Sequence, residues 1–362
     1  MLTTTEPTPG CLTLADGTRY EGVLHGAAPE AAPVAAEVVF TTAMGGYPEA
    51  ITDPSYQDQI LVMAYPQAGI YGVPADAVQS RGAMIRALVV RDIAPPPPRV
   101  EALEAFLGRH GVPLLAGIDT RALIRRLRSH GTVLGTVTAG RGGALPDPGR
   151  SARPDPLRAA GEQAAASGAA TTAYRLRVTV VDLGAKRAVL AMLAGHEGVD
   201  VRTVKPDTDP DAVVEQSDAV LFSNGPGDPA DMTSLLPFVR SVAERRPTFG
   251  ICLGHQLLAE AFGARTFKLG FGHRGVNHPV RHLESGQTWI TSHNHGYAVA
   301  EDGLPPDLEV TARDLTDNTV EGLRHRRLPI ITLQFHPEGS PGPREADLAL
   351  ERFLGGVREA RR

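Results

Sequence analysis

Cys252 stands where an apolar run, Thr248 to Ile251, meets a helix-like pattern that begins directly after it. A strand that turns sharply into a helix lifts the side chain of the turn residue out of the sheet, as the nucleophile elbow of hydrolases does with serine. The first turn of the helix also offers free backbone N–H groups and a positive dipole end. Both lower the pKa of a thiol and favour the reactive thiolate. The pattern therefore indicates a nucleophile, although a lone buried cysteine is usually inert.

Two other segments could supply the partners that such a nucleophile needs. A second apolar run, Ile330 to Phe335, leads directly into His336, Pro337 and Glu338. A histidine with a carboxylate two residues on can supply a base and the group that orients it. A glycine-rich loop, 223–229, also follows an apolar run, and its glycines let backbone amides approach a substrate closely. These residue types indicate nucleophilic catalysis by a cysteine with a histidine base.

Length and composition set the frame for this chemistry. The 362 residues suffice for two domains of ordinary size, and 42% apolar with 21% charged residues is a normal globular profile. A net charge of −5 gives no sign of nucleic-acid binding. No apolar run approaches the roughly 18 residues of a membrane helix, and the polar N-terminus does not resemble a secretory signal. Two cysteines, Cys11 and Cys252, cannot build a disulfide framework, so we expect a reducing cytoplasm.

The chain divides into two halves and a connector. The stretch 141–173 is rich in Gly, Ala, Pro and Ser without sustained periodicity, and we expect a linker there. Residues 1–140 contain short apolar runs typical of a smaller, strand-rich α+β domain. One of these runs, Cys11 to Leu14, precedes an Asp-Gly turn, and Asp119 or Thr120 could cap a helix that follows.

Residues 174–362 alternate apolar runs with amphipathic segments. This alternation predicts an α/β fold with a doubly wound, mostly parallel sheet covered on both faces. Ligands of such folds bind at the carboxyl ends of the strands. Gly225, Cys252 and His336 all follow predicted strands directly, so we expect them at one edge of the sheet.

Cofactor motifs are weak. Gly270 to Gly275 matches the dinucleotide pattern G-x-G-x-x-G, but no long apolar strand leads into it and Asn277-His278-Pro279 follows where a helix should begin. We therefore reject a nicotinamide or flavin site. The chain also lacks a G-x-x-x-x-G-K-[ST] loop, which argues against ATP binding of that kind.

Two clusters of basic residues have plain interpretations. Five histidines that lie close in sequence raise the possibility of a metal site: His273, His278, His282, His293 and His295. Their spacings match no familiar zinc pattern, so we expect polar loop histidines and no metal. Four arginines form a basic face that we expect to be solvated, with a protein partner as the alternative: Arg121, Arg125, Arg126 and Arg128.

The second half resembles the class I, triad-type glutamine amidotransferase domain. Two motifs carry this resemblance: Gly250 to Gln256 and His336 to Glu338. The whole chain resembles the family of small, glutamine-hydrolysing subunits of carbamoyl phosphate synthetase. The first half carries five segments of that family: Glu37 to Phe40, Met44 to Tyr47, Ile51 to Tyr56, Val90 to Asp92 and Gly117 to Arg121. The second half adds five more: Asp182 to Lys186, Ser223 to Pro229, Gly272 to Pro279, Asn294 to Gly296 and Ser340 to Pro343.

The resemblance implies roles for individual residues. Cys252 would be the nucleophile, His336 the base and acid, and Glu338 the residue that orients His336. The implied glutamine-binding residues come from both halves: Ala43, Gly225, Gly227, Leu253, Gln256, Asn294, Gly296 and Tyr297. The family usually has a serine at position 43, and often glutamine and phenylalanine where this chain has His293 and Tyr297. We expect the missing hydroxyl at position 43 to affect glutamine affinity rather than the chemistry.

The resemblance also implies a partner. Ammonia released from L-glutamine would pass to a separate large subunit, which makes carbamoyl phosphate from bicarbonate and ATP for arginine and pyrimidine synthesis. We expect no cofactor in this chain, ATP and Mg on the large subunit, a large-subunit contact on residues 1–140, and a heterodimer or a higher assembly. Three alternatives stay open: an amidotransferase for another synthetase, a stand-alone hydrolase of γ-glutamyl compounds, and a non-catalytic subunit.

Overall fold

The computed structural model describes residues 8–27, 33–140, 175–345 and 347–361. The chain divides into two compact units, Met1–Pro154 and Asp155–Arg362. The linker expected at 141–173 lies outside the described residues. No helix in the described ranges is long and apolar enough to cross a membrane.

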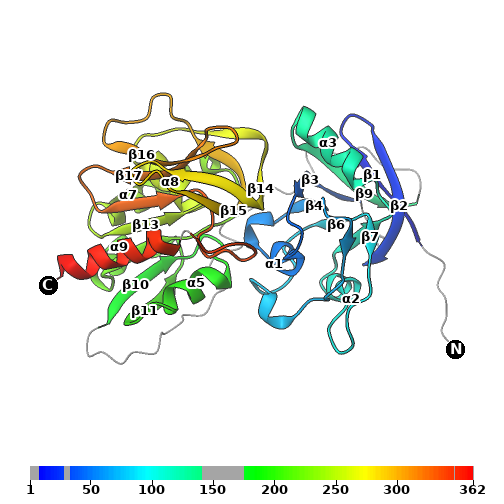
Figure 1. Cartoon of the computed structure of the whole chain (residues 1–362), viewed down its shortest axis with the longest axis horizontal. Helices are drawn as coiled ribbons and strands as arrows, with labels where there is room; N and C mark the ends of the chain where they lie inside the picture. The colour runs from blue at the N-terminus through cyan, green and yellow to red at the C-terminus, as the bar shows by residue number, and fades with distance from the viewer. Residues whose placement is uncertain (1–7, 28–32, 141–174, 346, 362) are drawn as a thin grey trace. The chain divides into compact units, whose positions relative to one another are not determined.

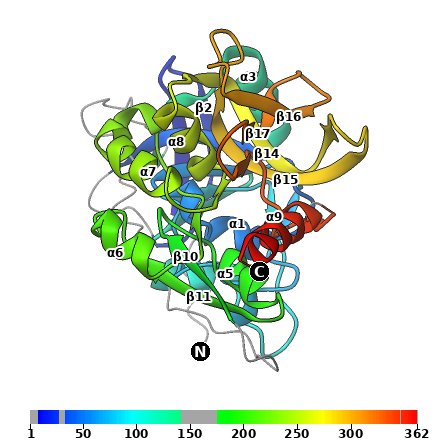
Figure 2. The same ribbon diagram turned by 90° about the vertical axis from the view of Figure 1, so that its left-hand side faces the viewer.

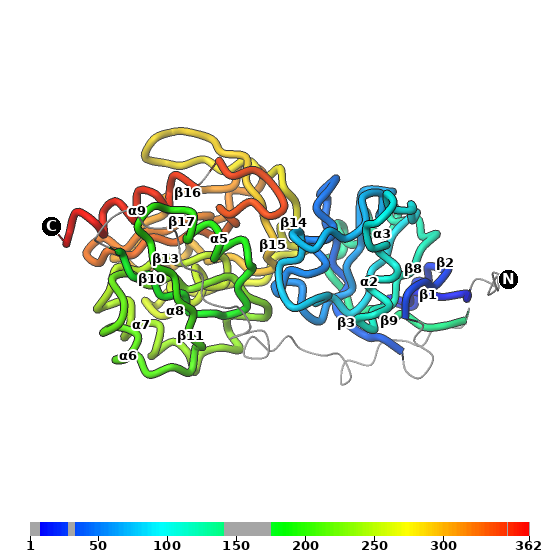
Figure 3. Tube along the Cα trace, turned by 90° about the horizontal axis from the view of Figure 1, so that it is seen from below, coloured from blue at the N-terminus to red at the C-terminus, as the bar shows by residue number. Residues whose placement is uncertain are grey.

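A closed barrel of seven strands, ordered β1-β2-β8-β6-β4-β3-β9, forms the centre of the first unit (Figures 1 and 3). Its strands are β1 (Thr8–Leu14), β2 (Arg19–Gly26), β3 (Val34–Thr41), β4 (Gln59–Met63), β6 (Ala87–Val89), β8 (Pro113–Ala116) and β9 (Val133–Ala139). Outside it lie β5 (Gln67–Ala68), β7 (Asp92–Ile93), α1 (Tyr47–Ile51), α2 (Leu103–Arg109), α3 (Thr120–His130) and the 3-10 turns η1 (Pro54–Tyr56) and η2 (Ala75–Ala77).

Local signals of the first half are confirmed. β1 and β2 pair antiparallel across the predicted Asp-Gly turn, where Gly17 has a φ of 84°. Asp119 caps α3, because its Oδ1 accepts a hydrogen bond from the Ala122 amide at 2.9 Å. The closure of the strands into a barrel was not predicted, because it depends on pairings between strands far apart in the sequence, such as β2 with β8.

The second unit contains one sheet of nine strands, ordered β11-β10-β12-β13-β18-β17-β15-β14-β16. The five strands that alternate with helices are parallel: β10 (Leu176–Val181), β11 (Val199–Val204), β12 (Ala219–Phe222), β13 (Thr248–Ile251) and β18 (Ile330–Leu333). Four further strands extend the sheet antiparallel: β14 (Thr266–His282), β15 (Thr288–Val299), β16 (Leu308–Asp314) and β17 (Val320–His325). The α/β class is therefore confirmed for this unit.

Helices pack against the parallel strands in two apolar cores. Val178 and Val180 of β10 face the core that contains α5 (Arg187–Ala194) and α9 (Asp347–Ala360). Val181 faces the other core, whose helices are α6 (Pro210–Glu215), α7 (Leu236–Ala243) and α8 (Leu253–Ala261), with the 3-10 segment η4 (Pro229–Leu235) beside them. Figure 2 shows α6 and α7 on one side of β10 and β11 and α5 and α9 on the other. Near-continuous apolar runs are expected for strands buried on both faces.

The antiparallel strands correct the interpretation of the histidines. All five were expected in polar loops, but His273, His278 and His282 lie in β14, and His293 and His295 lie in β15. Two register shifts interrupt the pairing of β14 with β15, between Lys268 and His273 and between Gly275 and His278. Such bulges break the alternation of buried and exposed residues, which is the sequence signal for a strand. The loop interpretation was therefore wrong.

A buried imidazole in α8 makes the stability of this unit sensitive to acid. Burial lowers the pKa of His255 to about 3, and its Nδ1 lies 2.7 Å from Thr332 Oγ1. A proton is then bound by the unfolded chain but not by the folded one between about pH 6.5 and pH 3. We expect His255 to reduce the free energy of unfolding by about 1.4 kcal/mol for each pH unit lost in that window.

Urea unfolding followed by the fluorescence of Trp289, the single tryptophan, measures this effect. His255→Gln should flatten the pH dependence below pH 6.5, whereas His130→Gln, on the exposed end of α3, should leave it unchanged. Equal slopes in the His255 variant and the wild type would contradict the assignment.

Candidate active site

Cys252 occupies the turn between β13 and α8. Its φ and ψ of 53° and −104° are unusual for a residue with a side chain, and it stands at the N-cap of α8. Its amide is held by the carbonyl of Leu333 at 2.8 Å, and its side chain is buried at 3% exposure. Strained backbone of this kind persists only where the surrounding structure determines it, and it is common at active sites. The predicted elbow is thus present in the geometry.

Two glycines allow the backbone to pack closely around this turn. A Cβ at Gly254, in the first turn of α8, would lie 2.1 Å from the carbonyl oxygen of Phe222, so only glycine fits. A Cβ at Gly225 would lie 2.1 Å from the carbonyl oxygen of Leu183. The backbone after β12 and the start of α8 can therefore pack closely, a contact that the sequence pattern did not predict.

His336 follows β18, the strand next to β13, and pairs with Glu338. Its Nδ1 lies 2.8 Å from Glu338 Oε1, and its amide donates to the carbonyl of Ser292 at 2.8 Å. A carboxylate can only accept, so Nδ1 carries the proton and Nε2 carries a lone pair. Nε2 is buried and has no hydrogen-bond partner within the described ranges. The imidazole is therefore oriented with its basic nitrogen available.

Lys186 completes this group, and sequence reasoning did not assign it a role. Its Nζ lies 2.5 Å from Glu338 Oε1 and 2.9 Å from the carbonyl oxygen of Ser340, and the side chain is 2% exposed. Burial alone would raise the pKa of Glu338, but Lys186 and then His336 more than offset this, so the pKa lies well below its usual range. Glu338 therefore stays ionised. The resemblance had drawn attention to Asp182 to Lys186 as a segment only.

The start of α8 offers one free amide beside the sulfur. The amide of Cys252 donates to Leu333 and that of Gly254 donates to the carbonyl of Ser223 at 3.0 Å. The Leu253 amide between them has no hydrogen-bond partner in the part of the chain that is described. An amide at a helix N-terminus can stabilise a forming oxyanion.

Four of the residues predicted to bind glutamine gather around α8 and β15. The Cys252 Sγ donates to the carbonyl oxygen of Asn294 at 3.7 Å. Gln256 donates through Nε2 to the carbonyl of Tyr297 at 2.9 Å and to Gln334 Oε1 at 3.1 Å. Gly296 lies between Asn294 and Tyr297 in β15. Gln256 thus connects α8 to β15 and to the segment that follows β18.

The other predicted residues are placed as follows. Gly225 and Gly227 lie in the loop after β12, and Gly227 has a φ of 99°. Ala43 belongs to the first unit, two residues after the end of β3, where it is 3% exposed and its amide lies 3.3 Å from Thr41 Oγ1. Ala43 and the other predicted residues belong to different units, so a role for Ala43 in the glutamine site stays a prediction.

The arrangement in the second unit can support acyl transfer. It combines a thiol at a helix N-terminus, an imidazole that follows the adjacent strand β18, an ionised carboxylate and a backbone amide. The imidazole Nε2 and this amide have no hydrogen-bond partner among the described residues. The thiol, imidazole, carboxylate and amide can act, in that order, as the nucleophile, the base, the group that orients the base, and the donor to the oxyanion.

Comparisons with known proteins cover both units. The family model of glutamine amidotransferase class-I matches residues 179–355. The family model of the carbamoyl-phosphate synthase small chain, CPSase domain, matches residues 12–137.

Curated relatives match over nearly the full length. A carbamoyl phosphate synthase small chain of Symbiobacterium thermophilum is 47% identical over 355 residues, which cover 94% of this chain and 97% of the relative. A carbamoyl phosphate synthase arginine-specific small chain of Bacillus subtilis is 39% identical over 359 residues, which cover 98% of each chain.

Proposed function

Because this chain belongs to the family of carbamoyl phosphate synthase small chains, we propose that it hydrolyses L-glutamine through a thioester on Cys252 and delivers ammonia to a large subunit. The large subunit would use that ammonia with bicarbonate and ATP to form carbamoyl phosphate. The observation that carries the proposal is the strained Cys252 directly after β13, together with the His336–Glu338 pair that follows β18, the strand paired with β13.

The proposed reaction has two halves. His336 Nε2 accepts the thiol proton, and the Cys252 sulfur attacks the γ-carboxamide carbon of glutamine. The carbonyl oxygen becomes an oxyanion near the Leu253 amide. His336 then donates the proton to the departing ammonia, which leaves a thioester. In the second half, Nε2 takes a proton from water, the hydroxide attacks the thioester carbon, and glutamate and the free thiol are released.

Two buried side chains support His336 in this scheme. Glu338 holds the Nδ1 proton and stabilises the imidazolium that forms in each half. Lys186 keeps Glu338 ionised, because its ammonium lies against the same carboxylate oxygen. Both act by positioning and charge rather than by bonding to glutamine.

The proposed domain assignment follows the family-model matches. Residues 1–140 would contact the large subunit and contribute Ala43 to the glutamine site, and residues 174–362 would form a doubly wound amidotransferase domain. Glutamine would be held by backbone around Gly225 and Gly227, by Leu253 and Gln256, and by Asn294, Gly296 and Tyr297. The two apolar cores against the parallel strands support this assignment.

Reconstitution with a carbamoyl phosphate synthase large chain tests the function. Glutamine, bicarbonate and MgATP should yield carbamoyl phosphate and glutamate in equal amounts, and omission of either chain should abolish glutamine-dependent synthesis. Glutamate release at full rate without the large chain, and no carbamoyl phosphate with it, would instead favour a stand-alone hydrolase.

Ala43 provides a test of glutamine binding. If a serine hydroxyl at this position donates to glutamine equally in the ground state and the transition state, Ala43→Ser should lower KM about 2- to 10-fold with little change in kcat. Steady-state glutaminase kinetics of the two-chain complex measure this. Ala50→Ser, in α1, is the matched control and should not change KM. An unchanged KM in Ala43→Ser would show that position 43 does not limit glutamine affinity.

A further inference from the structure

A buried group of side chains with metal-binding atoms lies where β14, β15 and β17 meet. It consists of His273, His293, His295 and Glu321, whose side chains are 7%, 0%, 1% and 0% exposed. His273 lies directly opposite His295 in the β14–β15 pairing, and His293 lies opposite Gly275. The mechanism proposed above uses none of these four residues.

One nitrogen of each imidazole and a carboxylate oxygen of Glu321 lie within 4.8 Å of one another, close to the spacing of a coordination shell. His293 Nδ1 lies 3.1 Å from His295 Nε2 and 3.7 Å from Glu321 Oε2. Glu321 Oε1 lies 3.6 Å from His273 Nδ1 and 3.9 Å from His295 Nε2. Nitrogen and oxygen ligands about 2.0–2.1 Å from a tetrahedral zinc ion would be about 3.4 Å apart. The observed separations of 3.1–3.9 Å scatter around that value.

The outward nitrogen of each imidazole is hydrogen-bonded. His273 Nε2 lies 2.8 Å from Asp317 Oδ2, His295 Nδ1 lies 2.8 Å from the carbonyl oxygen of Tyr297, and His293 Nε2 lies 2.7 Å from Thr291 Oγ1. Histidines that ligate a metal usually donate their other ring N–H to a carboxylate, a carbonyl or another acceptor, which fixes the ring and its tautomer. All three imidazoles satisfy that condition.

These outer bonds determine which ring nitrogens carry protons. A carbonyl only accepts, so His295 Nδ1 is protonated and its Nε2 has a lone pair. The Thr291 hydroxyl donates its single proton to the carbonyl of His278 at 2.9 Å, so His293 Nε2 donates to Thr291 and His293 Nδ1 has a lone pair. The two lone pairs therefore face each other at 3.1 Å, beside the carboxylate of Glu321.

Unsatisfied atoms point to the same centre. His273 Nδ1 and Glu321 Oε2 are buried and, among the described residues, have no hydrogen-bond partner. Glu321 Oε1 accepts a hydrogen bond from Thr319 Oγ1 at 3.2 Å, but no donor faces Oε2 among the described residues. Buried lone pairs that face a buried carboxylate are unfavourable unless a cation lies between them.

We propose that His273, His293, His295 and Glu321 form a structural site for a divalent transition metal of the zinc class, held in tetrahedral N₃O coordination. Imidazole nitrogen with one carboxylate is a ligand set that suits Zn²⁺ and Co²⁺ and disfavours Mg²⁺ and Ca²⁺, which prefer oxygen alone. Four protein ligands leave no open position, so the metal would stabilise structure rather than activate water.

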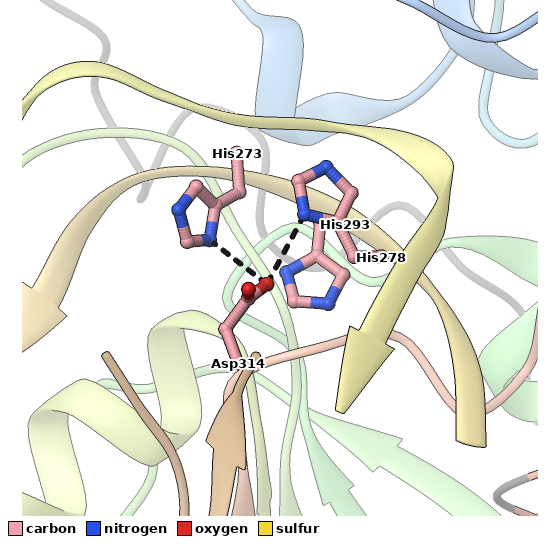
Figure 4. A group of neighbouring side chains, drawn as sticks. All are labelled: His273, His278, His293 and Asp314. Atoms are coloured by element: carbon pink, nitrogen blue, oxygen red, sulfur yellow. Dashed lines mark hydrogen bonds and ion pairs between the residues drawn. The ribbon is translucent and has the colours of Figure 1, made fainter. Parts of the chain in front are cut away.

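His278 and Asp314 lie at the edge of this site. Figure 4 shows the Asp314 carboxylate next to His273 and His278, and Asp314 Oδ2 lies 3.2 Å from His278 Nδ1 and 3.9 Å from His273 Nδ1. Asp314 is already held by Thr316, whose amide donates to Oδ1 at 2.6 Å. We therefore assign these two residues to the support of His273 rather than to the metal.

The metal would fix one wall of the candidate active site. Asn294, whose carbonyl lies 3.7 Å from the Cys252 sulfur, stands between His293 and His295 in β15. Ligands on both sides of Asn294 would hold this carbonyl in place through the strand. We therefore expect loss of the metal to lower the thermal stability of the second unit. We also expect it to lower glutaminase activity, because β15 would no longer hold the Asn294 carbonyl in place.

Metal analysis of the purified full-length chain tests the proposal. After incubation with Zn²⁺ and gel filtration, the wild type should retain about one equivalent by plasma mass spectrometry. His293→Gln and Glu321→Gln should each weaken Zn²⁺ binding about 100-fold or more in competition with a chelator. His282→Gln is the matched control, because this histidine lies on β14 but bonds to Ser285 Oγ at 2.9 Å, outside the group.

Spectroscopy of the wild type makes the test independent of how the variants fold. Co²⁺ in place of Zn²⁺ should give the intense visible absorption of a four-coordinate ion, and titrated Zn²⁺ should abolish it. Less than a tenth of an equivalent of retained Zn²⁺, a weak six-coordinate Co²⁺ spectrum, or binding unchanged in both variants would overturn the proposal. An imidazolium signal at His273 in the metal-free chain, unaltered by Zn²⁺, would show that a proton occupies the centre instead.

Discussion

Cys252→Ser should lower glutamine-dependent carbamoyl phosphate synthesis at least about 1,000-fold while ammonia-dependent synthesis by the two-chain complex stays near the wild-type rate. The sulfur is the proposed nucleophile, and a serine hydroxyl is far less ionised at neutral pH than a thiol at a helix N-terminus. Removal of a nucleophile from a concerted set commonly costs several orders of magnitude in kcat. Ammonia added from solution bypasses the glutaminase step and reports on the large chain alone.

Cys11→Ser is the matched control for this experiment. Cys11 is also free and buried, but it lies in β1 of the first unit, where its sulfur is 3.7 Å from Thr13 Oγ1. Its substitution should leave both activities close to wild type. Glutamine-dependent synthesis that survives in Cys252→Ser would remove the thioester mechanism, and loss of the ammonia-dependent rate would indicate a failure of assembly instead.

Lys186→Met should lower the free energy of unfolding of the second unit by about 3–5 kcal/mol at pH 7. The variant leaves the Glu338 carboxylate buried without its ammonium partner, and an uncompensated buried charge carries a cost of this size. Lys186 is 2% exposed and Glu338 is fully buried, so water cannot replace the pair. Urea unfolding followed by Trp289 fluorescence measures the loss.

The pH dependence of the Lys186→Met effect has a definite sign. In the wild type the pKa of Glu338 is depressed, so its contribution to stability is present above the unfolded value near pH 4.5 and is lost as the pH falls toward the folded value. Without Lys186, burial raises the pKa of this carboxyl, which can then take up a proton in mild acid. The difference between wild type and variant should therefore shrink from pH 7 to pH 5.

A double-mutant cycle separates the pair from the packing of Lys186. Lys186→Met with Glu338→Gln removes both charges, so the double variant should recover at least half of the stability lost in Lys186→Met. Arg240→Met is the control, because Arg240 forms an exposed ion pair with Glu244. We expect this variant to lower the free energy of unfolding by less than about 1 kcal/mol. Additive losses in the cycle would mean that the Lys186–Glu338 ion pair does not stabilise the fold.

Much of the second unit could be predicted from local patterns. The strands β10, β12, β13 and β18 are short apolar runs, and each is followed by a polar or glycine-rich turn. Parallel strands place their carboxyl ends at one edge, so the sequence also predicted that Cys252 and His336 lie at the same edge of the sheet. Burial, turn chemistry and helix periodicity act within about ten residues, which is why they are visible in the chain itself.

The antiparallel strands and the histidine group could not be predicted in this way. β14 is half exposed, bulged and rich in glycine and histidine, so its periodicity is weak. The proposed metal site combines three histidines of β14 and β15 with Glu321 of β17. Glu321 lies about fifty residues after His273 in the chain, and no spacing rule links two residues at that distance. Pairing between strands, rather than sequence distance, brings these side chains together.

The amino-acid sequence alone determined the family, the elbow cysteine with its histidine and glutamate, and the α/β class, because these depend on residue types at short, fixed spacings. The tertiary structure decided what surrounds them. It put Lys186 against Glu338 and turned three of the expected loop histidines toward one buried carboxylate. Among the described residues, it also left the Leu253 amide and His336 Nε2 without hydrogen-bond partners. Desolvation and charge pairing are properties of the space that a fold encloses, and that space exists only after distant strands have paired.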